Sequence, residues 1–129
     1  MSERPSILPE DGSNIIIAAA LEVHRHLGPG LLESAYEECL CHELETRGIQ
    51  FYRQRSLPIV YKGRTLECGY RLDIVVNNNI LLELKSVEKL LPIHEAQLLT
   101  YLKLSGIRTG LLINFNEILL KNGIKRLVL

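Results

Sequence analysis

The feature that most constrains the fold is a run of three asparagines at residues 77–79, set between two apolar segments. Asparagine tolerates left-handed backbone angles, so three in succession predict a tight turn. On both sides, in residues 72–76 and 80–84, apolar side chains recur with the two-residue period of a β-strand. The sequence therefore predicts a β-hairpin in which Val76 pairs with Ile80.

That register has a consequence for two acidic residues. We expect Leu72, Ile74 and Val76 to share one face of the hairpin, and Asp73 to lie opposite Glu83 on the other face. A slip of one residue would put the apolar rows on different faces, so the pattern opposes it. Two acids directly across a strand pair normally destabilise a sheet.

A sequence tolerates such a pair if one carboxyl is protonated, if a cation lies between the two, or if the pair is well solvated at the end of the sheet. A hard divalent ion is the most useful of these, because Mg²⁺ takes oxygen ligands and needs one or two protein carboxylates. Lys85 follows Glu83 on the same face, where an ammonium group could orient an attacking water or neutralise charge on a phosphate. The alternative is an ordinary cluster of solvated surface charges.

Helical and β-rich segments make up the rest of the chain. Ser13 or Asn14 is a good N-cap, and Pro92 suits the first turn of a helix. We predict helices over residues 14–27, 31–47 and 91–105, and strands over 49–53, 57–61, 65–76, 80–85, 109–115 and 124–129. The order α-α-β-β-β-β-α-β-β predicts a small α/β domain, with a central mixed sheet flanked by helices.

The helical spacing also predicts which side chains form the core. The first helix should bury Ile16, Ala19, Ala20 and Val23, and the second should bury Leu32, Ala35, Leu40 and Leu44.

The length of 129 residues suits one domain. Residues 1–12 are polar, with two prolines, and predict a flexible N-terminal arm before a single domain at 13–129. No strictly apolar stretch exceeds residues 15–21, far below the ~18 residues that cross a bilayer, so we expect no membrane association. We also expect no secretory leader.

The three cysteines include no CxxC pair and support neither a disulfide framework nor a zinc site. We expect inert buried thiols in a reducing compartment, and hence a cytoplasmic protein.

The charge is balanced, with 15 Lys+Arg against 15 Asp+Glu, which disfavours a protein that coats nucleic acid non-specifically. An enzyme that acts on nucleic acid can still be neutral overall. Five cations surround the predicted short strands and fit either phosphate contacts or the charges that keep edge strands from aggregating: Arg53, Arg55, Lys62, Arg64 and Arg71.

Three motifs occur in one order along the chain. Asp73 followed by Glu83-Leu84-Lys85 resembles the D…(D/E)xK core of the PD-(D/E)xK nuclease-like superfamily. The segment from Gly30 through Glu33 to Tyr36 resembles the motif of the GxxExxY family, a branch of that superfamily.

The third motif lies on the last predicted helix, where Gln97 and Tyr101 resemble the QxxxY element of exonuclease-like members. The resemblance covers about residues 14–129. One departure is Leu72, which stands where many members have a proline.

The resemblance implies a divalent-metal phosphodiesterase site with Mg²⁺ or Mn²⁺ as cofactor. The implied metal ligands are Asp73 and Glu83, with Glu33 as an additional acidic ligand or water-holding group; the implied catalytic residues are Lys85, Gln97 and Tyr101. The implied function is a nuclease acting on DNA or RNA. A homodimer fits this function and its alternative alike, because so compact a nuclease often needs a second copy to span a duplex. The alternative is a catalytically inactive binding or interaction module that keeps the nuclease fold.

Several of these side chains also suit purely structural roles. Glu33 would complement the dipole at the start of a helix, and Tyr36 would be a half-buried residue that packs against the core. Gln97 could belong to a solvated helix face. His24 fits a structural histidine better than a site residue, and His42 is expected at the surface.

Overall fold

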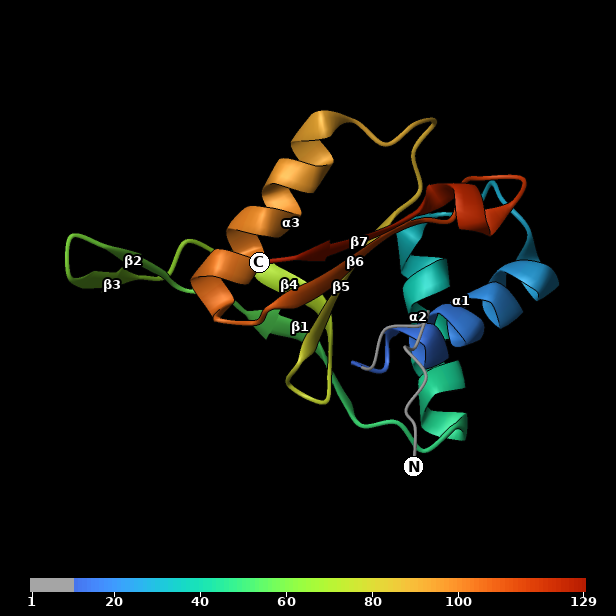
Figure 1. Ribbon diagram of the computed structural model, residues 1–129, viewed down its shortest axis with the longest axis horizontal. Helices are drawn as coiled ribbons and strands as arrows, with labels where there is room; N and C mark the ends of the chain where they lie inside the picture. Colours follow the sequence, from blue (N-terminus) through green and yellow to red (C-terminus); the bar gives the residue numbers. More distant parts are fainter. Residues whose placement is uncertain (1–10) are drawn as a thin grey trace, which may run out of the picture.

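A five-stranded mixed sheet forms the centre of the fold in the computed structural model, which describes residues 11–129 (Figure 1). Three α-helices accompany it: α1 (Ser13–Leu27), α2 (Glu33–Thr46) and α3 (Pro92–Ser105). The strands are β1 (Phe51–Ser56), β2 (Ile59–Tyr61), β3 (Arg64–Leu66), β4 (Arg71–Val76), β5 (Ile80–Lys85), β6 (Thr109–Asn114) and β7 (Ile124–Val128). A short 3₁₀ helix, η1 (Leu120–Gly123), precedes β7.

The strand order in the sheet is β1-β4-β5-β6-β7. Strands β5 and β6 are parallel and every other neighbouring pair is antiparallel. Parallel strands need a crossover connection, and α3 supplies it between β5 and β6. The predicted α/β class, with a mixed sheet flanked by helices, is confirmed.

Two apolar clusters lie on the two faces of the sheet. The first joins α1 and α2 to the sheet and contains the predicted stripe of α1, which is buried throughout. The second joins α3 to the other face and includes Val75, Leu81, Leu98 and Leu112. Alternate residues of β5 therefore face different clusters: Leu82 faces α1 and α2, whereas Leu81 faces α3.

The predicted strand over residues 65–76 is two strands, β3 and β4, so the sequence-based order lacked one strand. Gly69, with φ 79°, lies between them in a conformation that favours glycine. Strands β2 and β3 form a separate antiparallel hairpin, which stands away from the rest of the molecule (Figure 1).

The second helix begins at Glu33, two residues later than predicted, and its predicted core residue Leu32 is 77% exposed. That prediction is wrong because Leu32 is the extended N-cap residue, with ψ 153°, and precedes the helical stripe. Leu40 and Leu44 are buried as predicted, and Ala35 is half-buried.

The N-cap of α1 is Gly12, so neither Ser13 nor Asn14 holds the predicted position. The Asp11 carboxylate accepts hydrogen bonds from the backbone N–H and hydroxyl of Ser13, and it pairs with Arg126 at 2.6 Å. Most of the predicted N-terminal arm, residues 1–10, lies outside the described residues.

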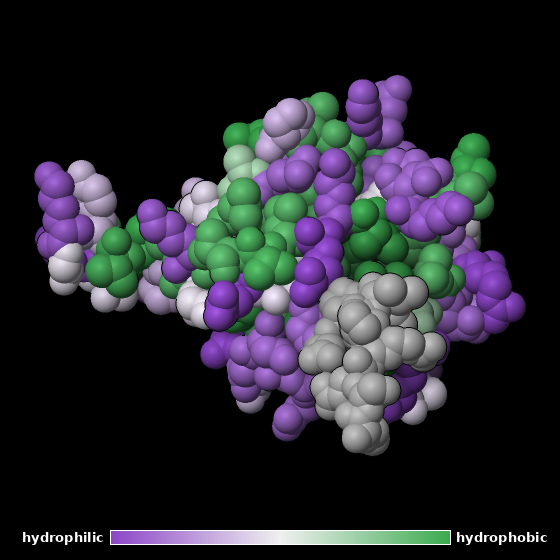
Figure 2. Space-filling view, viewed as in Figure 1, coloured by the Kyte–Doolittle hydropathy of each residue, from purple (hydrophilic) through white to green (hydrophobic). Residues whose placement is uncertain are grey.

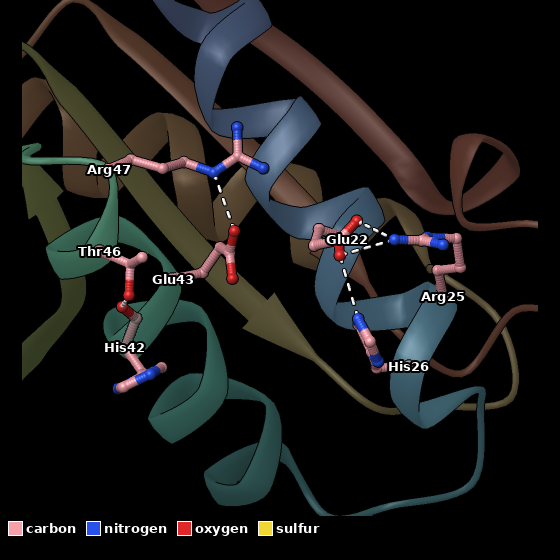
Figure 3. A network of polar contacts seen from close by, with 7 residues as sticks. All are labelled: Glu22, Arg25, His26, His42, Glu43, Thr46 and Arg47. Carbon is pink, nitrogen blue, oxygen red and sulfur yellow. Dashed lines mark hydrogen bonds and ion pairs between the residues drawn. The ribbon is translucent and has the colours of Figure 1, made fainter.

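The exposed surface of α1 and α2 carries a network of polar contacts (Figure 3). Glu22 accepts hydrogen bonds from Arg25 at 2.6 Å and lies 3.0 Å from His26. Arg47 donates to Glu43 at 3.0 Å, while His42 is exposed as predicted. Exposed pairs of this kind contribute little to stability.

The cysteines differ in environment. Burial raises the pKa of the Cys41 thiol to about 11, which fits an inert side chain. Cys39 is half-buried, whereas Cys68 is exposed, so the prediction of buried thiols is wrong for Cys68. None of the helices within residues 11–129 has the length and apolar character needed to span a membrane.

Candidate active site

The β4–β5 hairpin has the register that the sequence predicts. Val76 pairs with Ile80 and Ile74 pairs with Leu82. Asn77 and Asn78 have φ values of 51° and 56°, as expected of asparagines in a tight turn.

The regular backbone pairing of β4 with β5 ends just before Asp73 and Glu83. Beyond that point, hydrogen bonds from backbone N–H groups to these two side chains join the strands. Asp73 Oδ2 accepts the backbone N–H of Leu84 at 2.9 Å, and Glu83 Oε1 accepts the backbone N–H of Asp73 at 3.4 Å. Each carboxylate thus binds the main chain of the neighbouring strand, and the two acids lie together as predicted.

Strand β4 is also irregular on its other side. The β1–β4 pairing lacks the pair between Gln54 and Asp73, and Gln54 has a φ of 50°, which is uncommon for a residue with a side chain. This break explains a wrong prediction: Leu72 packs in the cluster under α3, not with Ile74 and Val76. The alternation of side chains is interrupted at Asp73.

The surroundings of the two acids disfavour negative charge. Glu83 is only 5% exposed, and burial, followed by the charge of Asp73, raises its pKa to about 8. Burial also raises the pKa of Asp73, and the charges of Glu37 and Glu33 add to that effect. The donor set suits a hard cation, because a positive ion would compensate charges that the protein leaves in excess.

Lys85 projects to the same side as Glu83 but forms no ion pair with either acid among the described residues. Its ammonium group donates to Gln97 Oε1 at 3.4 Å, and Gln97 Nε2 donates to the Tyr101 hydroxyl at 3.1 Å. Burial and the nearby Glu83 raise the pKa of Tyr101. Three residues of two predicted motifs therefore form one hydrogen-bonded chain.

Tyr36 has a structural role. It is fully buried, not half-buried as predicted, and its ring stacks on Phe115 with centroids 4.5 Å apart. Its hydroxyl donates to the carbonyl of Gly28 at 2.6 Å and accepts the N–H of Leu31 at 3.1 Å. Tyr36 therefore fixes the loop that leads into α2.

The same loop is attached to the end of β5, because the Ser86 hydroxyl donates to the Leu31 carbonyl at 2.5 Å. Glu33, the first residue of α2, is exposed and contributes to the raised pKa values of both acids. It does not join them in a metal-binding group: within residues 11–129 no three His, Cys, Asp or Glu side chains lie close enough to hold an ion. Its role as a ligand stays a prediction.

Two residues near the site were not predicted as part of it. Glu37, one turn after Glu33, accepts hydrogen bonds from Arg53 at 2.9 Å and Gln54 at 2.8 Å. The helical spacing of Glu33 and Glu37 was a usable signal for Glu37, but no local pattern marks Gln54. Arg53 is engaged by Glu37 and Glu38, which favours a structural role over phosphate contact.

His24, a buried residue of α1, has a structural contact, in line with its structural interpretation. Its Nε2 is 2.7 Å from the carbonyl of Glu117, in the loop after β6. The side chain thereby connects α1 to that loop.

Comparison with known proteins agrees with this fold. Residues 10–127 match the family model of the PD-(D/E)XK nuclease superfamily. Searches of curated proteins and of solved structures gave no significant match. Because the matched segment includes every helix and nearly every strand residue described above, the chain belongs to the PD-(D/E)XK nuclease superfamily.

Proposed function

We propose that the chain is a divalent-metal-dependent nuclease of the GxxExxY branch, hydrolysing phosphodiester bonds in DNA or RNA. The proposal depends mainly on one observation: the half-buried Asp73 and the buried Glu83 each bind the backbone across the β4–β5 hairpin, and Lys85 projects to the same side as Glu83. Such a pair suits Mg²⁺ or Mn²⁺.

The residues have distinct proposed roles. Asp73 and Glu83 hold the cation, which when bound supplies positive charge that polarises the phosphate. Lys85 places an ammonium group beside the attacked phosphate, where it stabilises the charge that develops during the reaction. Gln97 positions that ammonium group, and Tyr101 positions Gln97. Glu33 is placed to hold a water molecule at the edge of the site.

The test is cleavage of labelled single-stranded and duplex DNA and RNA by the full chain, with Mn²⁺, Mg²⁺ or EDTA. We expect ion-dependent cleavage that Lys85→Ala lowers by about 10² to 10³-fold. Lys103→Ala is the matched control, because Lys103 is an exposed lysine of α3. Equal cleavage by wild type and Lys85→Ala would refute the assignment.

A binding module with the nuclease fold is the second candidate. The balanced charge, together with a two-carboxylate set that lacks a third ligand among the described residues, favours it. Calorimetric titration with Mn²⁺ separates the two: the nuclease gives heat that Asp73→Asn abolishes, whereas a module without a working site gives none.

We also propose a cytoplasmic protein and, for cleavage of a duplex, a homodimer that presents one site to each strand. Sedimentation analysis with and without duplex DNA tests the dimer.

A further inference from the structure

A groove of about 270 Å³ runs between α3 and the chain that leads into β4. Its lining is largely apolar and comes from Ile59 at the base of the β2–β3 hairpin, Tyr70, and the α3 residues Ile93, Ala96 and Leu104. Ile93 is 67% exposed and Tyr70 is 45% exposed. The groove therefore offers aliphatic side chains and a partly exposed aromatic side chain to a ligand.

The groove is continuous with the candidate active site. Gln97 and Tyr101 line it, and these residues form the outer end of the hydrogen-bonded chain that begins at Lys85. The Tyr70 ring meets the Tyr101 ring edge-on, with centroids 6.1 Å apart. A group in the groove would consequently lie next to a phosphate bound at Lys85.

The size and chemistry of the groove select among possible occupants. Its volume is below the ~300–1,000 Å³ of pockets for drug-sized ligands, so it suits a single flat ring system. Nucleobases stack on aromatic side chains whatever their identity, and the Gln97 amide offers a polar partner for a base edge.

The hairpin that borders the groove also carries positive charge. The β2–β3 hairpin, whose base supplies Ile59, carries Lys62 and Arg64 at its far end, and neither forms an ion pair with any residue in 11–129. Lys62 lies over the ring of Tyr61 at 5.4 Å. Figure 2 shows hydrophilic side chains at the tip of this hairpin and hydrophobic ones nearer the body of the molecule. A strand leaving the groove along the hairpin would meet cations that attract its phosphates.

We propose that this groove is a subsite for one unpaired nucleobase of the substrate, and that the chain therefore acts on single-stranded or frayed nucleic acid. The proposal rests on the proposed nuclease function and adds the substrate form. The base stacks on Tyr70 and packs on Ile93, while the adjoining phosphate lies at Lys85. A base within a duplex is paired and stacked on its neighbours, and must be extruded before it can enter.

The test measures binding separately from cleavage. Fluorescence anisotropy of the full chain in EDTA compares an oligothymidylate with an abasic strand of equal length, which carries the same phosphates but no bases. We expect the oligothymidylate to bind at least about tenfold more tightly. Tyr70→Ala and Ile93→Glu should each remove most of the preference for the oligothymidylate over the abasic strand. Tyr70→Ala should also leave the affinity for the abasic strand largely unchanged.

Two matched controls exclude general effects of truncation and of added charge. Tyr52→Ala removes a tyrosine of similar exposure, 50%, from β1, and Ile118→Glu alters an isoleucine that is 86% exposed beyond β6. Neither residue lines the groove, so both variants should retain the wild-type ratio.

The proposal is overturned if wild type binds the two strands equally, or if a duplex binds as tightly as the single strand. It is also overturned if Tyr52→Ala lowers the ratio as much as Tyr70→Ala. Self-association that Ile93→Glu abolishes, without base-dependent binding, would assign the groove to a second copy. Base-dependent binding without Mn²⁺-dependent cleavage would refute the nuclease and leave the subsite standing.

Discussion

Asp73 and Glu83 each bind a backbone N–H across the β4–β5 hairpin, at the point where the regular strand pairing ends. The carboxylates are thereby oriented by main-chain groups of a buried sheet, not by mobile side chains. A site that holds an ion needs ligands fixed in this way. Four predictions follow from the contacts around this pair and around the motifs that flank it.

The first prediction concerns the pH dependence of stability without metal. The Glu83 pKa is raised from 4.5 to about 8, so the folded chain retains a proton that the unfolded chain releases. This contribution to the free energy of unfolding is full below pH 4.5 and is lost as pH rises through about 8. Urea unfolding in EDTA between pH 6 and pH 9 should show a falling midpoint that Glu83→Gln flattens. If the urea midpoint of Glu83→Gln falls as much as that of wild type over this pH range, the prediction is wrong.

The second prediction concerns metal-dependent stabilisation. An ion that binds only the folded chain, at a hundred times its dissociation constant, adds about 2.7 kcal/mol. Addition of Mn²⁺ at pH 8 should therefore raise the melting temperature of wild type but not of Asp73→Asn. Glu45→Gln, which alters an exposed acid near the end of α2, should respond as wild type does. Stabilisation of Asp73→Asn by Mn²⁺ would place the ion elsewhere.

The third prediction concerns Gln97 as a positioning residue. Gln97→Ala leaves the Lys85 charge in place but removes its hydrogen-bond acceptor. We expect a loss of about tenfold in kcat with KM for oligonucleotide little changed, which is smaller than the loss in Lys85→Ala. Gln97→Glu keeps an acceptor oxygen and should recover part of the rate. A larger effect from Gln97→Ala than from Lys85→Ala would contradict this order.

The fourth prediction concerns the tyrosine of the GxxExxY-like segment. Tyr36→Phe keeps the stacking on Phe115 but leaves the Gly28 carbonyl and the Leu31 N–H without their partner. Because unsatisfied buried polar groups are costly, we expect a loss of about 1–3 kcal/mol in the free energy of unfolding. Tyr61→Phe, at an exposed tyrosine, should change it by less than about 0.5 kcal/mol. Equal stability of Tyr36→Phe and wild type would show that the hydroxyl contacts contribute nothing.

The local sequence pattern determined the register of the β4–β5 hairpin and the bounds of α3. The asparagine turn and the two-residue apolar period were enough to predict the register of β4 and β5, because side-chain alternation and turn geometry act between near neighbours. The bounds of α3 followed from Pro92 and Gly106 for the same reason. The approach of Asp73 to Glu83 is a consequence of that register and was therefore predictable.

Only the tertiary structure decided where distant segments meet. The motif resemblance assigned Gln97 to the site, but no local pattern indicates that its amide binds Lys85. Nor does any local pattern indicate that Gln54 interrupts the pairing at Asp73, or that Tyr36 is buried against Phe115. Leu32 and Leu72 were misplaced for the same reason, since their periodicity continued past the point where a loop or an irregular pair ended it. Periodicity records the repeat of one element, whereas these contacts depend on how elements from different parts of the chain pack together.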